Sequence, residues 1–582
     1  MCGINGFTYH DPILLNKMME LCKSRGPDGN NNYLDQHISI SHNRLSILDL
    51  SKNASQPFIY KNLVLSFNGE IFNFLELKKE LIAKNYKFIT NSDTEVLIKL
   101  FYEFNIDAFK KISGIFAISI WDLEKKILYL IRDIVGVKPL YYYADSSNNL
   151  YFSSLIKPLL ISASKRLNLE AANYYWNMGF NGLNETIFKN IYKVLPGELI
   201  IYKNKNFYKK KFLSFDFDKK IETNNIKNEI KNIINKQTVS DVPIALSLSG
   251  GIDSNIILSA INRNKIKTYN VSYSHNGIKS KDSIYANIRS KIYNTTHEEF
   301  EIKSNDFLED LEIITSILEE PIANQNSISN YFLSKKIKEK VIFSGDGGDE
   351  IFTGYNKYRS IFFFNLISKI NIFKNYNLNI KKKNIKRCFI SSMREMHLSF
   401  SNQNSLLNNS KIFNNFKKIN SDELFFNHLQ EENYNSDLKN IMFSDIDTWV
   451  QNDVLMRNDK IFMSKGIEVR VPFLDQEMIE KFLFLESNKL HPFKYKNFLK
   501  NQFKDDLKNT LTEKKGFDSP YVFWLKEERN LSKIKFYLSK EYYNSVLINY
   551  DEVKEILSKN KINFYQIFSI LVFQIFLKQN NF

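Results

Sequence analysis

The sequence predicts a layered α+β domain followed by an α/β domain with a doubly wound parallel sheet and a mostly helical C-terminal extension. Three observations support this fold class. Short apolar runs of strand length dominate residues 1–205, strands alternate with helical patterns from about residue 226, and helical patterns prevail beyond residue 357. At 582 residues the chain is also too long for one hydrophobic core, so two domains are expected.

The elements of the first domain follow from residue type and spacing. Residues 63–67, 115–121 and 127–131 are rich in β-branched and aromatic side chains, which predicts strands. Residues 74–84 and 94–103 have helical patterns. The polar stretch 214–225 is predicted to be a linker.

In the second domain the pattern changes to alternating helices and strands. We expect a helix over 226–235, a strand over 243–248, and then a Ser/Gly turn and another helix. A strand over 268–273, a helix near 283–293 and a strand over 340–343 follow. This alternation is typical of a parallel sheet. Residues 370–440, rich in Asn, Lys and Phe, are expected to form helical packing without recognisable chemistry.

Composition disfavours several classes of protein. No apolar run approaches the roughly 18 residues that a membrane span requires, and no signal peptide is apparent. Three scattered cysteines form no disulfide or zinc framework, so a reducing cytoplasm is expected. The net charge of +16 is nearly all lysine and accompanies heavy use of Asn, Ile, Phe and Tyr, as in an AT-rich genome. The most basic stretch, 381–387, lacks interleaved aromatics, so a solvated surface is favoured over nucleic-acid binding.

The second residue of the chain is a candidate nucleophile. Removal of Met1 would leave Cys2 with a free α-amino group whose reference pKa of about 8 suits a general base. Nucleophile and base would then belong to one residue, as in enzymes with an N-terminal threonine. The alternative is that Cys2 is an accident of the start codon.

Four polar side chains and one glycine in the first domain could complete a site for a free amino acid amide. Arg44 could bind the α-carboxylate, and Glu70 and Asp93 could bind the α-ammonium group. The Asn68 side chain and the Gly69 backbone N–H could stabilise a tetrahedral oxyanion. Simpler interpretations exist for each: a surface ion pair between Arg44 and Asp93, a hairpin turn at Asn68-Gly69, or a helix cap at Asp93.

Two glycine-containing loops in the second domain follow predicted strands. Residues 248–254 (Leu-Ser-Gly-Gly-Ile-Asp-Ser) lie between a strand and a helix, where backbone N–H groups can approach phosphate oxygens. This loop is not a Walker A motif, and it looks like the pyrophosphate loop of ATP pyrophosphatases. Residues 344–350 carry three carboxylates that suit Mg²⁺ on a nucleotide. The simpler interpretations are a tight turn and a solvated acidic loop.

Motifs along nearly the whole chain resemble glutamine-hydrolysing asparagine synthetases. In the first domain they are Cys2-Gly3-Ile4 and residues 25–28, 44–47, 67–71, 92–95 and 132–142. In the second they are the two loops, Glu320-Pro321 and residues 466–475 and 514–517. The resemblance implies a class II glutamine amidotransferase domain of Ntn-hydrolase type (αββα) over 1–210 and an ATP-dependent synthetase domain over 226–582.

The resemblance also implies roles for particular residues. Cys2 would attack the glutamine amide, and Asn68 and Gly69 would form the oxyanion hole. Glutamine would be bound by Arg44, Leu45, Ser46, Ile47, Asn68, Gly69, Glu70 and Asp93. ATP would be bound by Leu248, Ser249, Gly250, Gly251, Asp253, Ser254, Val271, Ser344 and Gly345. Asp253 and Asp349 would bind Mg²⁺, and Asp346 and Lys514 would be catalytic.

The implied reaction uses ATP to adenylate a carboxylate, which ammonia from glutamine then amidates with release of AMP. Aspartate is the expected acceptor. A sugar uronate or a peptide carboxylate, and a non-enzymatic relative, are the alternatives. Asn255 stands where serine is usual, and Glu319 where aspartate normally precedes Glu-Pro. We expect ammonia to travel inside the protein, because ammonium is not nucleophilic. Family members are often homodimers, and neither nucleic acid nor a membrane is expected as a partner.

Overall fold

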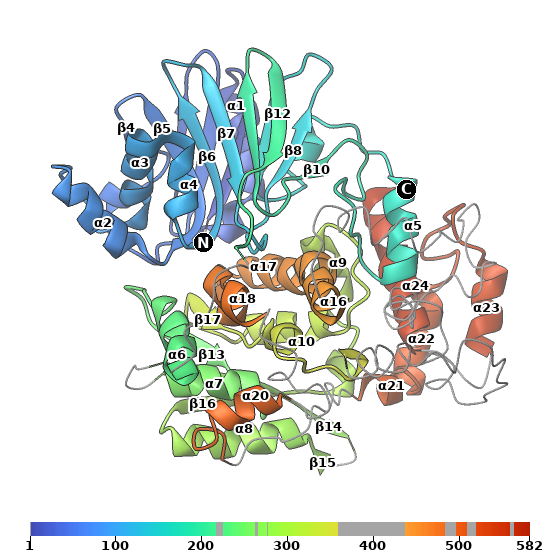
Figure 1. The fold of residues 1–582 in the computed structure, drawn as a ribbon. Helices are drawn as coiled ribbons and strands as arrows, with labels where there is room; N and C mark the ends of the chain where they lie inside the picture. The colour runs from blue at the N-terminus through green and yellow to red at the C-terminus, as the bar shows by residue number, and fades with distance from the viewer. Residues whose placement is uncertain are drawn as a thin grey trace, which may run out of the picture.

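The structure is a computed structural model that describes residues 2–216, 225–261, 266–275, 278–358, 437–483, 496–508, 520–558 and 564–582. The predicted linker lies partly outside these residues, as does most of the segment 370–440. The basic stretch 381–387 and Lys514 lie entirely outside them. In Figure 1 the strands of residues 3–211 form the upper domain, and the N-terminus lies at its lower edge, toward the rest of the chain.

Residues 2–216 form two antiparallel sheets of six strands each. The first has the order β10-β8-β9-β1-β3-β2, with bounds Tyr192–Lys193, Tyr141–Ala144, Leu150–Ser153, Gly3–Phe7, Ser39–Arg44 and Gly29–Leu34. The second has the order β12-β11-β7-β6-β5-β4, with bounds Asn206–Lys211, Glu198–Lys203, Ile127–Arg132, Gly114–Asp122, Leu63–Ile71 and Phe58–Tyr60. The strands predicted at 63–67, 115–121 and 127–131 are confirmed as β5, β6 and β7.

The two sheets pack face to face and helices cover their outer faces. Apolar side chains of both sheets, such as Ile40 and Phe152 from one and Val64 and Leu130 from the other, form the core between them. Helix α1 (Pro12–Leu21) packs on β1 and β3. Helices α2 (Phe74–Ala83), α3 (Asp93–Phe104) and α4 (Ala108–Lys111) lie at the second sheet. The layers therefore follow the αββα order, as predicted.

The described residues from 225 onward form one sheet of six strands. Its parallel strands have the order β16-β14-β13-β17-β18, and β15 pairs antiparallel with β14. The bounds are Thr296–Ile302, Lys267–His275, Ile244–Ser247, Val341–Phe343, Glu468–Arg470 and, for β15, Ile278–Lys279. The predicted parallel sheet is confirmed, and the carboxyl ends of β13 and β17 carry the two glycine-containing loops.

Helices flank this sheet on both faces (Figure 1). On one side lie α6 (Ile226–Lys236), α7 (Ile252–Ala260) and α8 (Lys281–Ile292). On the other lie α9 (Leu311–Leu318), α10 (Asn326–Ser334) and α17 (Met456–Met463). The face of α17 toward the first domain bears charged side chains that matter below.

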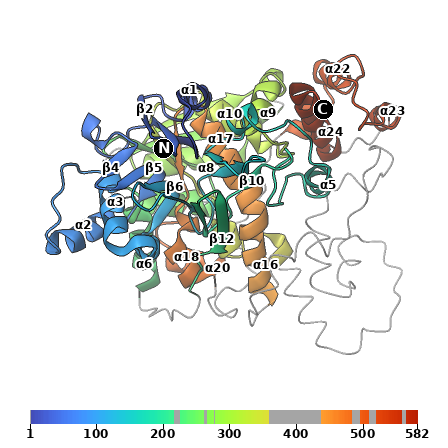
Figure 2. The same cartoon turned by 90° about the horizontal axis from the view of Figure 1, so that it is seen from above.

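The remaining described helices form the C-terminal extension and shorter connections. They are α5 (Leu169–Met178), α11 (Gly348–Ile351), α16 (Asp437–Asp445), the π-helix Ile446–Leu455, α18 (Gln476–Phe482), α20 (Asn497–Gln502), α21 (Tyr521–Trp524), α22 (Glu528–Tyr537), α23 (Tyr550–Ser558) and α24 (Phe564–Asn580). Both views place α5 beside α24 (Figures 1 and 2), and the Tyr175 hydroxyl donates to the Ser569 carbonyl at 2.8 Å. Among the described residues, no helix is long and apolar enough to cross a membrane.

Candidate active sites

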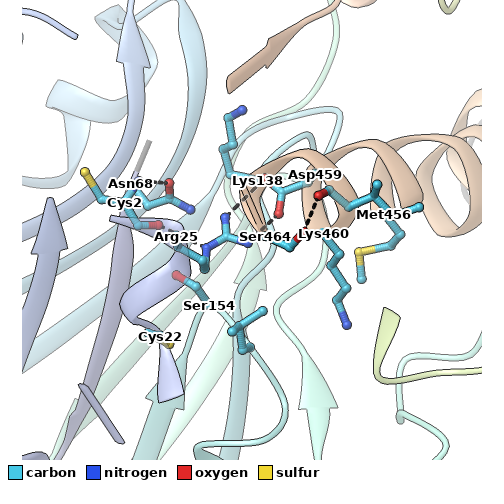
Figure 3. Close-up of polar contacts among 12 residues, drawn as sticks. Cys2, Cys22, Arg25, Asn68, Lys138, Ser154, Met456, Asp459, Lys460 and Ser464 are labelled. Carbon is cyan, nitrogen blue, oxygen red and sulfur yellow. Dashed lines mark hydrogen bonds and ion pairs between the residues drawn. The ribbon is translucent and has the colours of Figure 1, made fainter. Parts of the chain in front are cut away.

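Cys2 lies directly before β1, at the end of the first sheet that faces the second domain. Its side chain is buried, and its nitrogen donates a hydrogen bond to Asn68 Oδ1 at 2.9 Å (Figure 3). Burial raises the pKa of the Cys2 thiol. The sulfur therefore needs a base to become a nucleophile at neutral pH.

Asn68 and Gly69 come from β5 in the opposite sheet. Asn68 Nδ2 is buried and has no hydrogen-bond partner among the described residues. At Gly69 a Cβ atom would lie only 2.0 Å from the Ile115 carbonyl oxygen, so only glycine allows this close strand pairing. Because Asn68-Gly69 lies within a strand, the hairpin-turn interpretation is wrong. The unused amide donor beside Cys2 is suited to an oxyanion.

A small pocket brings most of the predicted glutamine-binding residues together. Its lining includes Cys2, Arg44, Leu45, Ile47, Gly69, Glu70 and Asp93. It also includes Gln56, which sequence analysis missed and whose Oε1 accepts a hydrogen bond from the Phe67 N–H at 2.7 Å. Two predicted residues, Ser46 and Asn68, are not part of the lining. The Ser46 backbone N–H donates to Asp28 Oδ2 at 2.7 Å, and Asn68 contacts the Cys2 nitrogen.

The charged groups of this pocket are held in place by the backbone. Arg44 donates to the carbonyls of Ser51, at 2.7 Å, and Asp49. Ser92 caps α3, so the cap interpretation of Asp93 is wrong; Asp93 Oδ2 instead accepts from the Ile71 N–H at 3.0 Å.

Burial raises the pKa of both acids in the pocket. The pKa of Asp93 is raised to about 6 by burial. Burial and the nearby Asp93 raise the pKa of Glu70 well above its usual value. A ligand with a positive charge would favour the ionised form of both carboxyls.

The second domain reaches Cys2 through Arg25, a contact that sequence analysis did not predict. Arg25 Nε donates to the Cys2 carbonyl at 3.1 Å, and its two terminal nitrogens lie 2.7 and 3.2 Å from the carboxylate of Asp459 on α17 (Figure 3). Both side chains are buried. The turn motif identified Arg25, but no local pattern could link it to a partner 434 positions away.

Strand β18 approaches the same pocket from the second domain. Arg470 Nη2 lies 3.7 Å from Glu70 Oε1. The sequence singled out residues 466–475 by resemblance alone and gave Arg470 no role.

A larger cavity, of about 440 Å³, lies at the carboxyl ends of β13, β14 and β17. The predicted residues in its lining are Leu248, Ser249, Gly251, Asp253, Ser254, Val271, Ser344, Gly345, Asp346 and Asp349. Gly250 is not part of the lining, and its N–H donates to Asp282 Oδ1 at 2.9 Å. This edge of a parallel sheet is where ligands bind in such folds.

The loop before α7 is shaped by its own side chains. The Ser249 N–H donates to Ser254 Oγ at 3.1 Å, and the Gly251 N–H donates to Ser249 Oγ at 3.1 Å. Asn255 Nδ2 donates to the Gly251 carbonyl at 2.6 Å, so the unusual asparagine supports the loop. Among the described residues, no side chain caps α7, which leaves its first N–H groups available to an anion.

The acidic loop after β17 packs against the first loop at glycine positions. A Cβ atom at Gly348 would lie 2.4 Å from Asp253 Oδ1, so a larger residue there would displace the Asp253 carboxylate. Asp346 Oδ2 accepts hydrogen bonds from Ser344 Oγ at 2.6 Å and from Asn458 Nδ2 at 2.7 Å. The two loops therefore form one wall of the cavity.

Two carboxylates of this wall converge on one cation. Lys496 Nζ lies 2.5 Å from Asp253 Oδ1 and 2.7 Å from Asp349 Oδ1. Mg²⁺ needs only one or two carboxylates besides nucleotide phosphates, so Asp253 and Asp349 fit this ion. Within the described residues there is no group of three or more His, Cys, Asp or Glu side chains that could hold a metal alone. Sequence analysis missed Lys496.

The lining of this cavity also includes an arginine that sequence analysis missed. Arg457 of α17 is 4% exposed, and its Nη1 has no hydrogen-bond partner among the described residues. Its Nε lies 3.3 Å from Asp453 Oδ1 in an ion pair, and Arg457 is part of the cavity lining. Burial raises the pKa of Glu350, another residue of the lining, to about 7. A buried guanidinium with an unused donor is suited to an anionic group of a ligand.

A buried thiol lies in an αββα domain, which is joined to a parallel-sheet domain with a glycine-containing loop at the carboxyl edge of its sheet. This arrangement is expected for a two-site glutamine amidotransferase. Comparison with known families agrees. Residues 1–213 match the glutamine amidotransferase domain and residues 225–578 match asparagine synthase. The chain therefore belongs to the asparagine synthase family.

Relatives of the chain are named asparagine synthetases. The chain is 29% identical to asparagine synthetase [glutamine-hydrolyzing] 1 of Bacillus subtilis, over 99% of this chain and 96% of that protein. It is 30% identical to a putative asparagine synthetase [glutamine-hydrolyzing] 2 of Methanocaldococcus jannaschii, over 62% of this chain and 78% of that protein. The solved glutamine phosphoribosylpyrophosphate amidotransferase of B. subtilis shares 18% identity over 42% of this chain and 61% of that chain, with a TM-score of 0.29.

Proposed function

We propose that this enzyme hydrolyses glutamine at Cys2 and uses the ammonia to convert aspartate to asparagine, with cleavage of ATP to AMP and pyrophosphate. The observation that carries the proposal is the Cys2–Asn68 contact. One amide atom holds the Cys2 nitrogen at 2.9 Å, while the other has no hydrogen-bond partner among the described residues. The domains would correspond to residues 1–210 and 226–582.

The glutaminase step follows from these contacts. After removal of Met1, the Cys2 nitrogen becomes an α-amine that accepts the thiol proton, and the sulfur attacks the amide carbon of glutamine. Asn68 Nδ2 and the Gly69 N–H donate to the oxyanion. Ammonia leaves with the transferred proton, and water hydrolyses the thioester to glutamate.

Glutamine itself would be bound through its charged ends. Arg44, which its backbone contacts hold in place, would bind the α-carboxylate. Glu70 and Asp93 would bind the α-ammonium group. Leu45, Ser46 and Ile47 would flank the substrate.

The synthetase step would take place in the larger cavity. Backbone N–H groups of residues 249–254 would bind the pyrophosphate portion of ATP, and Leu248, Val271, Ser344 and Gly345 would surround the adenylate. Mg²⁺ held by Asp253 and Asp349 would neutralise phosphate charge. Asp346 and Lys514 would act on the reacting acceptor and phosphate.

Arg457 supports an acceptor with a second anionic group. Aspartate has an α-carboxylate in addition to the β-carboxylate that becomes adenylated, and the unused donor of Arg457 would bind it. Arg457→Gln is therefore expected to raise the KM for aspartate more than tenfold, since a charge-assisted hydrogen bond contributes about 1.5–3 kcal/mol. Glutaminase activity should stay unchanged and serves as the internal control.

The decisive experiment measures AMP and asparagine after incubation with glutamine, ATP and Mg²⁺, with and without aspartate. Both products should rise with aspartate, and AMP that does not respond would point to another carboxylate acceptor. Cys2→Ala should abolish synthesis from glutamine and leave synthesis from ammonia intact. Loss of both would contradict the two-site scheme.

A further inference from the structure

Arg470, the last residue of β18, extends from the synthetase domain to the glutamine pocket. It is fully buried, and its Nε donates to Glu468 Oε1 at 2.5 Å. Nη1 donates to the Val239 carbonyl at 2.6 Å. These contacts use the inner side of the guanidinium and fix its direction.

The outer nitrogen of Arg470 faces the first domain. Nη2 has no hydrogen-bond partner among the described residues and lies 3.7 Å from Glu70 Oε1. The guanidinium carbon lies 5.6 Å from the centre of the Phe72 ring. Glu70 is the next-to-last residue of β5 and Phe72 directly follows the strand, so the arginine contacts the end of β5 and the residue after it.

Glu70 lies in an environment that opposes its negative charge. Burial, followed by the nearby Asp93 of α3 and Glu468 of β18, raises its pKa, whereas the positive charge of Arg470 lowers it. The Cys2 thiol, just before β1, lines the same pocket. Without Arg470, a carboxyl buried beside two other acids would hold its proton to a higher pH.

We propose that Arg470 is a positioning residue of the glutamine pocket, whose guanidinium keeps the Glu70 carboxylate ionised and aimed at the α-ammonium group of glutamine. The inference rests on the proposed role of Glu70 in glutamine binding. The glutamine pocket is then incomplete without β18, so glutamine affinity depends on the docking of the two domains. Because Arg470 does not line the pocket, its effect should appear in KM rather than in kcat.

The test compares two variants of the full-length protein. Arg470→Gln removes the charge, and Arg470→Lys keeps a charge on a shorter, single-pronged donor. Glutaminase kcat and KM are measured against pH without ATP, and ammonia-dependent AMP release reports the folded synthetase domain. Arg470→Gln should raise the glutamine KM about tenfold or more at neutral pH, with kcat within about threefold. Arg470→Lys should have a smaller effect in the same direction.

The pH profile gives a readout that a merely structural role would not change. Loss of the guanidinium raises the pKa of the Glu70–Asp93 pair, so the acid limb of kcat/KM should move to higher pH, by about one unit. In a Glu70→Gln background the carboxylate that Arg470 acts on is absent. Adding Arg470→Lys to Glu70→Gln should therefore change the glutamine KM only slightly.

Two results would overturn the inference. In the first, Arg470→Lys retains ammonia-dependent synthesis and has the same glutamine KM and the same acid limb of kcat/KM as the wild type. The other is an equal KM increase with and without Glu70→Gln. If Arg470→Gln loses ammonia-dependent synthesis as well, it has failed to fold. The test then rests on Arg470→Lys, measured with and without Glu70→Gln. A wild-type protein without glutaminase activity would refute the proposed function instead, before any variant is compared.

Discussion

Asn68 offers a sharp test of the glutaminase mechanism, because its two amide atoms have separate tasks. Oδ1 accepts from the Cys2 nitrogen at 2.9 Å, and Nδ2 has no hydrogen-bond partner among the described residues. Asn68→Asp keeps an acceptor for the nitrogen and removes the donor. Asn68→Ala removes both.

The expected magnitudes follow from these tasks. Loss of one oxyanion donor lowers kcat about 10²–10³-fold, which corresponds to about 2.7–4 kcal/mol. Loss of the hydrogen bond to the Cys2 nitrogen adds about 1.5–3 kcal/mol, because that nitrogen becomes charged in the reaction. We therefore expect glutaminase kcat to fall about 10²–10³-fold in Asn68→Asp and roughly 10³–10⁵-fold in Asn68→Ala.

The assay is glutamate release without ATP, with ammonia-dependent AMP release as the internal control. Asn30→Asp, on the exposed edge strand β2, is the matched control and should change neither rate. Asn68→Asp with more than a tenth of the wild-type kcat would refute the donor role. A parallel loss of ammonia-dependent synthesis would show that the substitution disturbs the whole fold.

Two further predictions concern buried charges. Asp459→Asn leaves the Arg25 guanidinium buried without its counter-ion, so it should lower the free energy of unfolding by about 3–5 kcal/mol in denaturant titrations. The control variant Asp107→Asn breaks an exposed ion pair and should lower it by at most about 1 kcal/mol. Equal losses in the two variants would contradict this prediction. Burial raises the pKa of Asp93 to about 6, so glutaminase kcat/KM should fall as the pH drops through about 6 and this carboxylate takes up a proton. Asp93→Asn removes the repulsion between the Asp93 and Glu70 carboxylates, so the remaining acid limb of the pH–rate profile should move to lower pH. An acid limb at the same pH as in the wild type would contradict the interaction between these two groups.

Much of the fold could be predicted because its signals are local. The β-branched and aromatic runs at 63–67, 115–121 and 127–131 lie in strands of the second sheet. The helices expected at 74–84 and 94–103 are α2 and α3. In each case the periodicity of apolar residues indicates which face packs against the core, and about ten consecutive residues are enough to show this periodicity.

Within the candidate sites, the sequence indicated single residues better than their neighbours. Cys2 and the loops 248–254 and 344–350 carry their chemistry in short motifs. Ser46 and Gly250, expected from the resemblance, do not line the pockets and instead use their backbone N–H groups elsewhere. A motif records residue type, whereas the direction of each group depends on the loop around it.

Fold class, family resemblance and the positions of the candidate reactive groups could all be predicted from the sequence, because periodicity and short motifs are local properties. Which charged side chains meet around these pockets depends on the folded chain. Arg25 pairs with Asp459, Glu70 approaches Arg470, and Lys496 lies between two acids that are far from it in the chain. A buried charge needs a counter-ion, and the residue that supplies it can lie at any distance along the chain. Local sequence patterns therefore do not predict these pairs.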